Sequence, residues 1–366
     1  MKERIRVLVA ACFYYSGLVA LAHRFTWRSG PRLLILNYHR AVGGDIRHQL
    51  LYLRRHYRVM HLEEALDELY TSSSAVKRSS DRRTPLVLTF DDGYRDNYTV
   101  AYALARELQI PLTIFLIPGY VDSGDHFWWL EGERLARRAQ VHEATIEGRT
   151  YHLDSDKERQ QLAHAIDAHV RYASTVAERE AFLASVREVL AIPSSVGIEE
   201  QQAMPLTWDE VQEMEASGWV SFGAHTLHHP VLACLTDRRE VQHEVGGCRM
   251  EVEQHLGHPV RTFAYPIGKL EHIGDEGLRA VREAGYKWAL TTIEGINTPR
   301  TDPYLLQRLP GNVALHWLVM ASELVGLLGN LSRLRKKWHR QRRQSWTRKS
   351  LLAQVSRRHN AASGDR

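Results

Sequence analysis

The sequence lacks several features that would place a 366-residue chain in a structural class at once. Its three cysteines, Cys12, Cys234 and Cys248, have spacings that fit neither a cysteine-based metal site nor a disulfide framework. A Cys234–Cys248 disulfide bond could form in an oxidising compartment. A free cysteine is more typically a small apolar residue in the packing, and we expect this for all three. No internal repeat is evident, and no glycine-rich phosphate loop competes with the site described below.

A long apolar run is also missing. The uncharged stretch 7–22 has 16 residues, short of the ~20 that a comfortable membrane-spanning helix needs. Three interpretations stay open. A signal peptide is supported by the cations in the first six residues and the small-residue segment 20–22. An interfacial or short membrane anchor, which we favour, suits Tyr14 and Tyr15. The third is a helix packed on the domain.

Charge is unevenly spread. The net charge is +5, but residues 331–366 hold 12 Lys and Arg against one acid, so this tail contributes +11 and the remainder −6. Such a tail can bind anionic lipid or nucleic acid, or simply be solvated. With the amphipathic stretch 313–328 before it, we expect a membrane-surface contact through the N-terminal helix and the tail, and no nucleic-acid partner.

The most informative stretch is a short apolar run that ends in two acids. Residues 86–90 are apolar and β-branched, which predicts a buried strand. Asp91, Asp92 and Gly93 follow it. Because side chains alternate along a strand, the two carboxylates leave its end in different directions, so one can bind a cation while the other accepts a proton. An Asp-Asp-Gly alone is more typical of a turn.

A second segment changes that interpretation. His225 and His229 are four residues apart, so on a helical turn both imidazoles would face the same side. With Asp92 they make a set of two histidines and one carboxylate that leaves a position open for water, as catalytic zinc sites do. His228, three residues after His225, could also reach the metal, and we rank it as the second candidate for that ligand position.

The chain resembles a known family at these residues. Thr-Phe-Asp-Asp-Gly at 89–93 and His-Thr-x-x-His at 225–229 match the first two motifs of the polysaccharide deacetylases with the NodB-homology domain (carbohydrate esterase family 4). The segment from Arg261 to Gly268, with Tyr265-Pro266, is similar to their third motif. The resemblance covers roughly residues 32–310.

The order of elements predicts an α/β fold. Apolar strands at 86–90 and 111–118 flank an amphipathic helix at 98–108, which is typical of a parallel sheet covered by helices. The resemblance implies more narrowly a distorted (β/α) barrel of the NodB-homology type with a helical insertion. We therefore expect an N-terminal apolar helix in 1–30, a deacetylase domain in 31–312, and an amphipathic helix with a basic tail in 313–366.

The insertion is expected at about 126–205. Helical spacing marks 130–138, 156–170 and 176–190, and 144–153 is typical of a hairpin. Phe127-Trp128-Trp129 could line a sugar cleft by stacking, or anchor the insertion to the barrel, and both alternatives stay open.

The resemblance also implies roles. A divalent metal, with zinc as the first candidate, would be held by Asp92, His225 and His229. Asp91 would be the general base, and Arg261 could keep it ionised, since an adjacent cation favours the carboxylate. The backbone N–H of Tyr265 would be an oxyanion donor.

The general acid departs from the family's commoner pattern. Most members carry a histidine in a Leu-x-His motif, where this chain has Leu306-Gln307-Arg308, and arginine cannot cycle protons near neutral pH. The closest motif order is that of the poly-β-1,6-N-acetylglucosamine deacetylases, whose acid histidine sits upstream in a Tyr-His segment. We therefore predict that His39 is the acid, with a structural histidine as the alternative.

These features together predict a function. We expect a metal-dependent hydrolase that removes N-acetyl groups from an N-acetylhexosamine-containing polysaccharide or lipid-linked glycan, membrane-associated at the cell envelope. An O-acetyl esterase or amino-sugar deformylase using the same site, and a non-catalytic carbohydrate-binding protein, are the alternatives. A cytoplasmic location is the alternative to the envelope.

Overall fold

The computed structural model describes residues 2–27, 31–71, 81–193 and 203–328. The chain divides into two compact units, which we describe separately. The larger spans Gly30–Ala314, and the smaller combines Met1–Ser29 with Leu315–Arg366. All three cysteines are free thiols, so the structure contains no Cys234–Cys248 bond.

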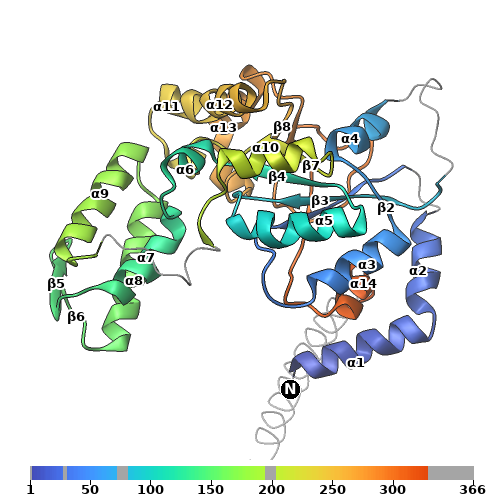
Figure 1. The fold of residues 1–366 in the computed structure, drawn as a ribbon, viewed down its shortest axis with the longest axis horizontal. Helices are drawn as coiled ribbons and strands as arrows, with labels where there is room; N and C mark the ends of the chain where they lie inside the picture. Colours follow the sequence, from blue (N-terminus) through green and yellow to red (C-terminus); the bar gives the residue numbers. More distant parts are fainter. Residues whose placement is uncertain (1, 28–30, 72–80, 194–202, 329–366) are drawn as a thin grey trace, which may run out of the picture. The chain divides into compact units, whose positions relative to one another are not determined.

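The larger unit is built on a parallel sheet. Among the described residues it has eight strands in the order β10-β1-β3-β4-β7-β8-β9, with β2 paired to β3. The sheet curls into a half-barrel with helices around it (Figure 1), which confirms the predicted α/β class. The strands are β1 (Leu34–Tyr38), β2 (Arg58–Val59), β3 (Pro85–Phe90), β4 (Leu112–Leu116), β7 (Val220–Ala224), β8 (Thr262–Ala264), β9 (Trp288–Leu290) and β10 (Leu309–Pro310).

The apolar composition of these strands explains their position. Every residue of β1 and β4, and all of β3 after Pro85, is buried, as expected for a parallel sheet covered on both faces. One core cluster joins residues far apart in the chain, including Leu33, Val87, Phe115 and Trp288. Because all these strands run in parallel, their carboxyl ends meet at one edge.

Helices cover the outside of the sheet. The predicted helix at 98–108 starts as a π-helical turn (Asn97–Tyr102) before α5, and a second π-helical turn spans His243–Gly247. The covering helices are α3 (Ile46–His56), α4 (Leu62–Tyr70), α5 (Ala103–Leu108), α6 (Pro118–Ser123), α10 (Trp208–Ala216), α11 (Arg238–Gln242), α12 (Cys248–Leu256) and α13 (Leu270–Glu283).

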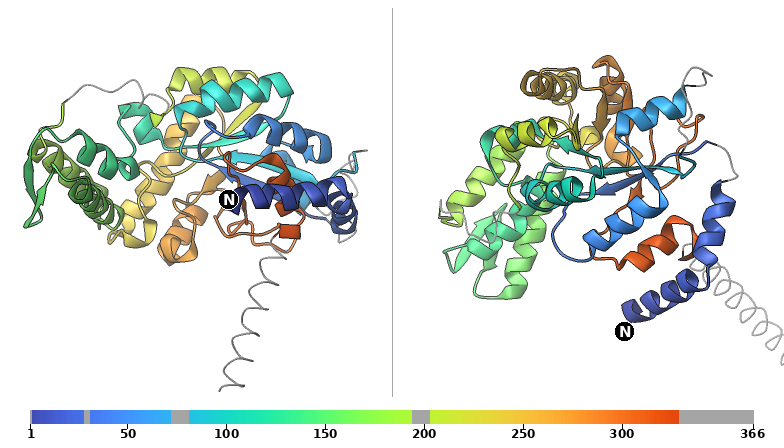
Figure 2. Two further views of the ribbon diagram at one scale, coloured as in Figure 1. Left: turned by 90° about the horizontal axis from the view of Figure 1, so that it is seen from below. Right: turned by 45° about the vertical axis from the view of Figure 1, so that its right-hand side comes forward.

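The insertion between β4 and β7 forms a lobe beside the sheet (Figure 2). It contains α7 (Trp128–Arg138), the hairpin β5 (Glu143–Ile146) and β6 (Arg149–His152), α8 (Asp156–Arg171) and α9 (Val176–Val189), close to the predicted ranges. Phe127 and Trp128 are buried in the cluster that joins this lobe to Ile117, the residue directly after β4. These two aromatics therefore anchor the insertion, whereas Trp129 is only half-buried.

The smaller unit combines helices from the first 27 residues with one helix that follows the larger unit in the sequence. α1 (Lys2–Tyr15) and α2 (Leu18–Trp27) are separated by a turn at Gly17, whose φ is 80°. Ala10 on α1 is buried against Leu318 and Val319 of α14 (Trp317–Leu324). In the described part of the chain no single helix is long and apolar enough to cross a membrane. The pair formed by α1 and α2, which is bent by 64°, is long and apolar enough when the two helices are taken together. The basic tail at 331–366 lies outside the described residues.

Candidate metal centre and catalytic site

The acidic pair lies where β3 ends. The Asp91 N–H donates to the Tyr38 carbonyl over 2.9 Å, which prolongs the sheet by one residue. Asp92 and Gly93 then both take left-handed conformations, with φ of 75° and 68°. A left-handed aspartate is uncommon and is often found at functional sites. This turn sends the two buried carboxylates to different partners, as the sequence predicted.

Asp91 is paired with an arginine from the other end of the domain. Arg308 donates from Nη1 to Oδ1 over 2.7 Å and from Nη2 to Oδ2 over 2.8 Å, and both side chains are almost fully buried. The Arg308 Nε–H donates to the Thr291 carbonyl over 2.8 Å, which fixes the guanidinium. Burial would raise the pKa of Asp91, but the charges of Arg308 and His225 and the hydrogen bonds from Arg308 together outweigh burial, and the pKa is lowered. Asp91 is therefore held as a carboxylate.

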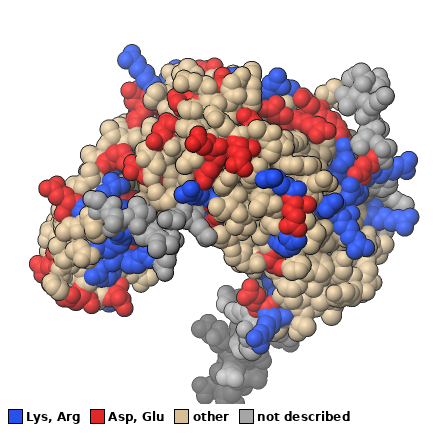
Figure 3. Space-filling view, viewed as in Figure 1, with Lys and Arg blue, Asp and Glu red and all other residues tan. Residues whose placement is uncertain are grey.

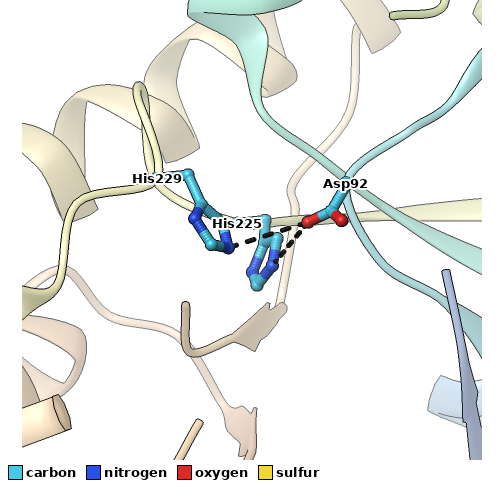
Figure 4. A group of neighbouring side chains, drawn as sticks. All are labelled: Asp92, His225 and His229. Atoms are coloured by element: carbon cyan, nitrogen blue, oxygen red, sulfur yellow. Dashed lines mark ion pairs between the residues drawn. The ribbon is translucent and has the colours of Figure 1, made fainter. Parts of the chain in front are cut away.

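Asp92 faces the two predicted histidines (Figure 4). Its Oδ1 lies 3.4 Å from His225 Nε2 and 3.7 Å from His229 Nε2. One ligand atom from each of the three residues falls within 4.8 Å of the others, and all three residues are buried. The structure thus brings together the residues predicted to hold a metal.

The histidines do not lie on a helical turn, so that part of the prediction is wrong. Residues 225–231 form a loop after β7, in which Thr226 and His229 take left-handed conformations, with φ of 65° and 55°. The His229 N–H donates to Thr226 Oγ1 over 2.9 Å, and Trp128 Nε1–H donates to the His229 carbonyl over 2.9 Å. The loop backbone and the insertion therefore aim His229 at Asp92.

The donor set fits a divalent cation. Asp92 Oδ1 is buried and has no hydrogen-bond partner among the residues that the structure describes, a costly state unless something else contacts it. The nearest donors, at 3.4 and 3.7 Å, are farther than a usual hydrogen bond. His225 Nδ1 lies 2.6 Å from the Ala264 carbonyl, so Nδ1 carries a proton and Nε2 faces the centre as a potential ligand.

The electrostatics of the two imidazoles agree with this. Burial opposes protonation of His225, but its contact with Asp92 and the charge of Asp91 outweigh burial, and the pKa of His225 is raised. Burial, followed by the charge of His225, lowers the pKa of His229 well below its usual value. The site therefore attracts one positive charge strongly while keeping the second imidazole neutral, which suits a cation held between them.

His228, the second-ranked ligand, turns away from this centre. Its Nδ1 lies 2.7 Å from Glu244 Oε1, and its N–H donates to Glu244 Oε2 over 2.9 Å. Glu244 is buried. His228 therefore fastens the loop to the π-helical turn that contains Glu244 and is outside the three-residue group.

His39 lies at the edge of the site. It follows β1 directly and is exposed, and its backbone carbonyl accepts from Asn97 Nδ2 over 3.0 Å. It is close enough for its charge to lower the pKa of both Asp91 and His229. An exposed histidine beside a buried carboxylate can reach both solvent and a bound substrate.

The predicted contact between Arg261 and Asp91 is wrong. Arg261 precedes β8 and is half-exposed, with Nη1 3.5 Å from Glu63 Oε2. Because the strands are parallel, a residue before β8 lies at the edge of the sheet opposite to the one where β3 ends. The cation on Asp91 is Arg308.

The predicted oxyanion role of the Tyr265 backbone is also wrong. The Tyr265 N–H donates to the Leu290 carbonyl over 3.0 Å, which extends the β8–β9 ladder by one residue. A donor engaged in the sheet cannot also bind a developing oxyanion. The Tyr265 ring is fully buried beside Phe263, which makes it a core residue.

Two residues complete the site in positions that the sequence did not assign to them individually. One is Arg308. The other is Trp129, whose ring centroid lies 4.4 Å from that of His229 and whose Nε1–H donates to the Tyr94 hydroxyl over 2.6 Å. A half-buried indole beside His229 offers an apolar surface next to the three-residue group. The run Phe127-Trp128-Trp129 indicated an aromatic surface near the site, but the sequence does not show which of the three residues provides it.

Comparisons with known proteins agree with this geometry. The polysaccharide deacetylase family model matches residues 78–289, a range that includes Asp91 and the three-residue group but neither His39 nor Arg308. The chain is 29% identical over 282 residues to YxkH of Bacillus subtilis (strain 168), whose name places it among the polysaccharide deacetylases. That alignment covers 76% of this chain and 71% of the relative.

Two solved structures are similar in fold. The deacetylase PplD of Streptococcus pyogenes, in complex with acetate, matches with a TM-score of 0.51 and 18% identity. IcaB from Ammonifex degensii matches with a TM-score of 0.50 and 20% identity. In both cases the match covers 80% of this chain and 97% of the other. At these identities the likeness concerns the fold alone.

Proposed function

The chain belongs to the polysaccharide deacetylase family, and we propose that it is a metal-dependent hydrolase that removes N-acetyl groups from an N-acetylhexosamine-containing polysaccharide or lipid-linked glycan. The observation that carries this proposal is the buried, unpartnered Asp92 Oδ1 between two imidazoles, beside a second carboxylate held separately by Arg308. A centre of this kind has the parts that amide hydrolysis needs: a cation site, a base and a nearby histidine.

Asp92, His225 and His229 would hold the ion, with zinc as the first candidate for two imidazoles and one carboxylate. When bound, a divalent ion lowers the pKa of water and polarises a carbonyl oxygen. The chain contributes the orientation of the three ligands. The Ala264 carbonyl fixes the His225 tautomer, while Thr226 and Trp128 fix the backbone of His229.

In this proposal Asp91 is the general base. It is ionised and immobile because Arg308 binds both of its oxygens, so it can accept the proton that an attacking water loses. Arg308 is a positioning residue, since it acts through Asp91. It takes the role that the resemblance suggested for Arg261.

His39 is the proposed general acid, which donates a proton to the leaving amine. Its support is its place at the carboxyl end of β1, the strand next to β3, and the effect of its charge on the pKa of Asp91. The Tyr38-His39 segment upstream of the acidic pair also supports a relation to the poly-β-1,6-N-acetylglucosamine deacetylases.

Trp129 supports a carbohydrate substrate. Its indole is partly exposed and lies against His229, where it can stack on the apolar face of a sugar ring. The identity of the glycan and the location of the enzyme at the cell envelope stay predictions.

The test is mass spectrometry of N-acetylglucosamine oligomers incubated with purified protein, before and after chelation and with zinc restored. The proposal predicts loss of acetyl groups that disappears with chelator, returns with zinc, and is absent in Asp92→Ala. Release of acetate from O-acetylated sugars alone, or of formate from formylated ones, would support the alternative hydrolases. Inert protein that binds the oligomers and contains no metal would indicate a carbohydrate-binding protein.

A further inference from the structure

The first helix of the smaller unit is apolar on two faces. Its inner face packs on α14 through Ala10, with Val7 and Tyr14 beside it. Away from that contact, Ile5, Leu8, Cys12 and Tyr15 are all exposed. Their spacings of three, four and three residues place them on one side of a helix. An amphipathic surface helix would have charged residues there, so this stripe indicates a partner other than water.

The stripe continues past the bend. Leu18 and Leu21 at the start of α2 are exposed as well, and the five large side chains from Ile5 to Leu21 expose between 42% and 77% of their surface. No Asp, Glu, Lys or Arg occurs in residues 7–23. The space-filling view shows a largely uncharged surface over α1, with both basic and acidic atoms near its start (Figure 3).

Cations flank this surface in the sequence. Lys2 and Arg4 precede the stripe and Arg24 follows it, and Arg4 and Arg24 are exposed, whereas Arg6 is paired with Glu323 of α14. Because α14 packs on α1, the segment that leads into the basic tail begins in the same unit. That tail holds 12 Lys and Arg against one acid. The chain therefore carries two signals for an anionic lipid surface, an apolar stripe in the structure and a polybasic segment in the sequence.

We propose that the smaller unit binds the surface of an anionic lipid bilayer, with α1 lying in the plane of the membrane and the stripe from Ile5 to Leu21 inserted among the headgroups. α1 has 14 residues, or about 21 Å of helix, against the ~30 Å of a hydrocarbon core. The 64° bend at Gly17 prevents α2 from extending it in line. α14 also covers the inner face, which leaves one side of α1 for lipid.

A vesicle-binding assay with the full chain tests the partner. Vesicles of equal parts phosphatidylcholine and phosphatidylglycerol should sediment the protein, whereas phosphatidylcholine vesicles should bind it at least about tenfold more weakly, because the polybasic segment is attracted only to anionic lipid. Salt should weaken the binding. Leu8→Gln/Leu21→Gln should weaken binding to the anionic vesicles about tenfold, because two inserted side chains become polar.

The matched control is Met250→Gln/Leu270→Gln. These side chains are 67% and 55% exposed but lie in the larger unit, so this variant should bind like the wild type. Equal loss in both double variants, or equal binding to neutral vesicles, would overturn the proposal. So would a stable dimer that Leu8→Gln/Leu21→Gln dissociates, because the stripe would then join two copies. Vesicle-independent binding of DNA by the full chain, with no vesicle binding, would assign the tail to nucleic acid instead.

Cys12 measures the depth of α1. It is exposed on the stripe, whereas Cys248 is buried, so in a Cys234→Ser background an environment-sensitive fluorophore attaches at Cys12. Lipids brominated near the headgroup should quench it more than lipids brominated near the chain ends. The opposite order would place Cys12 near the bilayer centre and replace the in-plane arrangement with a spanning one.

Discussion

Arg308 and Asp91 form a bidentate ion pair inside the sheet, with N–O distances of 2.7 and 2.8 Å and almost no exposure of either side chain. The two residues are 217 positions apart in the chain. They meet because β10, which starts directly after Arg308, pairs with β1, and β1 pairs with β3. Pairing of β10 with β1 therefore positions Arg308 against the carboxylate that we propose as the general base.

Loss of this pair should affect both folding and activity. Arg308→Ala leaves Asp91 buried without a counter-charge, and we expect the free energy of unfolding to fall by about 3–5 kcal/mol. Arg308→Lys keeps the charge but cannot bind both oxygens, so it should fold better than Arg308→Ala and still lose kcat. Denaturant unfolding and steady-state kinetics measure the two effects.

Arg261→Ala is the control for Arg308. Its exposed pair with Glu63 should be worth about 1 kcal/mol or less, with activity close to wild type. A large loss of activity in Arg261→Ala together with normal activity in Arg308→Lys would restore the original sequence-based assignment.

Two histidines of the same loop, His228 and His229, should differ in their effect on metal binding. His229→Ala should abolish binding of one zinc ion per chain, because only two ligands would remain. His228→Ala should retain that ion, because His228 contacts Glu244 and not Asp92. Competition with a chromogenic chelator reports both affinities. Metal loss in His228→Ala with retention in His229→Ala would exchange their roles.

Trp128 and Trp129 should have separable effects. His229 Nδ1 has no hydrogen-bond partner in the described part of the chain, so the Trp128 contact with its carbonyl is one of the few that hold this residue. Trp128→Phe keeps the ring but removes the donor, and should weaken metal affinity about 10-fold, at the lower end of the usual effect of such outer contacts. Trp129→Ala should instead raise KM for oligosaccharides while metal affinity changes little. A KM effect in Trp128→Phe with unchanged metal affinity would contradict this division.

The effect of removing His39 on kcat should depend on how much the leaving group needs a proton. His39→Ala should lower kcat on N-acetylated sugars by about 10²–10⁴, the usual contribution of an acid or base. The same variant should hydrolyse a p-nitrophenyl ester at a nearly unchanged rate, because that leaving group departs without a proton. Asp91→Asn should slow both substrates. Full activity of His39→Ala on the sugars would leave His39 as a structural residue.

Local patterns predicted much of this site. A short apolar run followed by two acids identified β3, and the match at 225–229 identified His225 and His229. The helical turn predicted for those histidines was wrong because Thr226 and His229 adopt left-handed conformations. Neither threonine nor histidine predicts such a conformation from the sequence.

Longer-range relationships could not be predicted. The Leu306-Gln307-Arg308 segment differs from the family pattern by lacking a histidine. That Arg308 pairs with Asp91 depends on the register of β10 with β1, which the segment itself does not show. Arg261 was misassigned because a motif gives a residue's order along the chain and not the edge of the sheet at which it lies. Tyr265 failed for a similar reason, since pairing with Leu290 occupies its N–H.

The most direct test is an anomalous diffraction map from crystals grown with zinc and measured at the zinc absorption edge. The proposed site predicts one strong peak within ligand distance of Asp92 Oδ1, His225 Nε2 and His229 Nε2, about 2.0–2.2 Å from each, and no peak in crystals of Asp92→Ala. Zinc bound elsewhere while these three atoms remain without it would contradict the metal-dependent hydrolase.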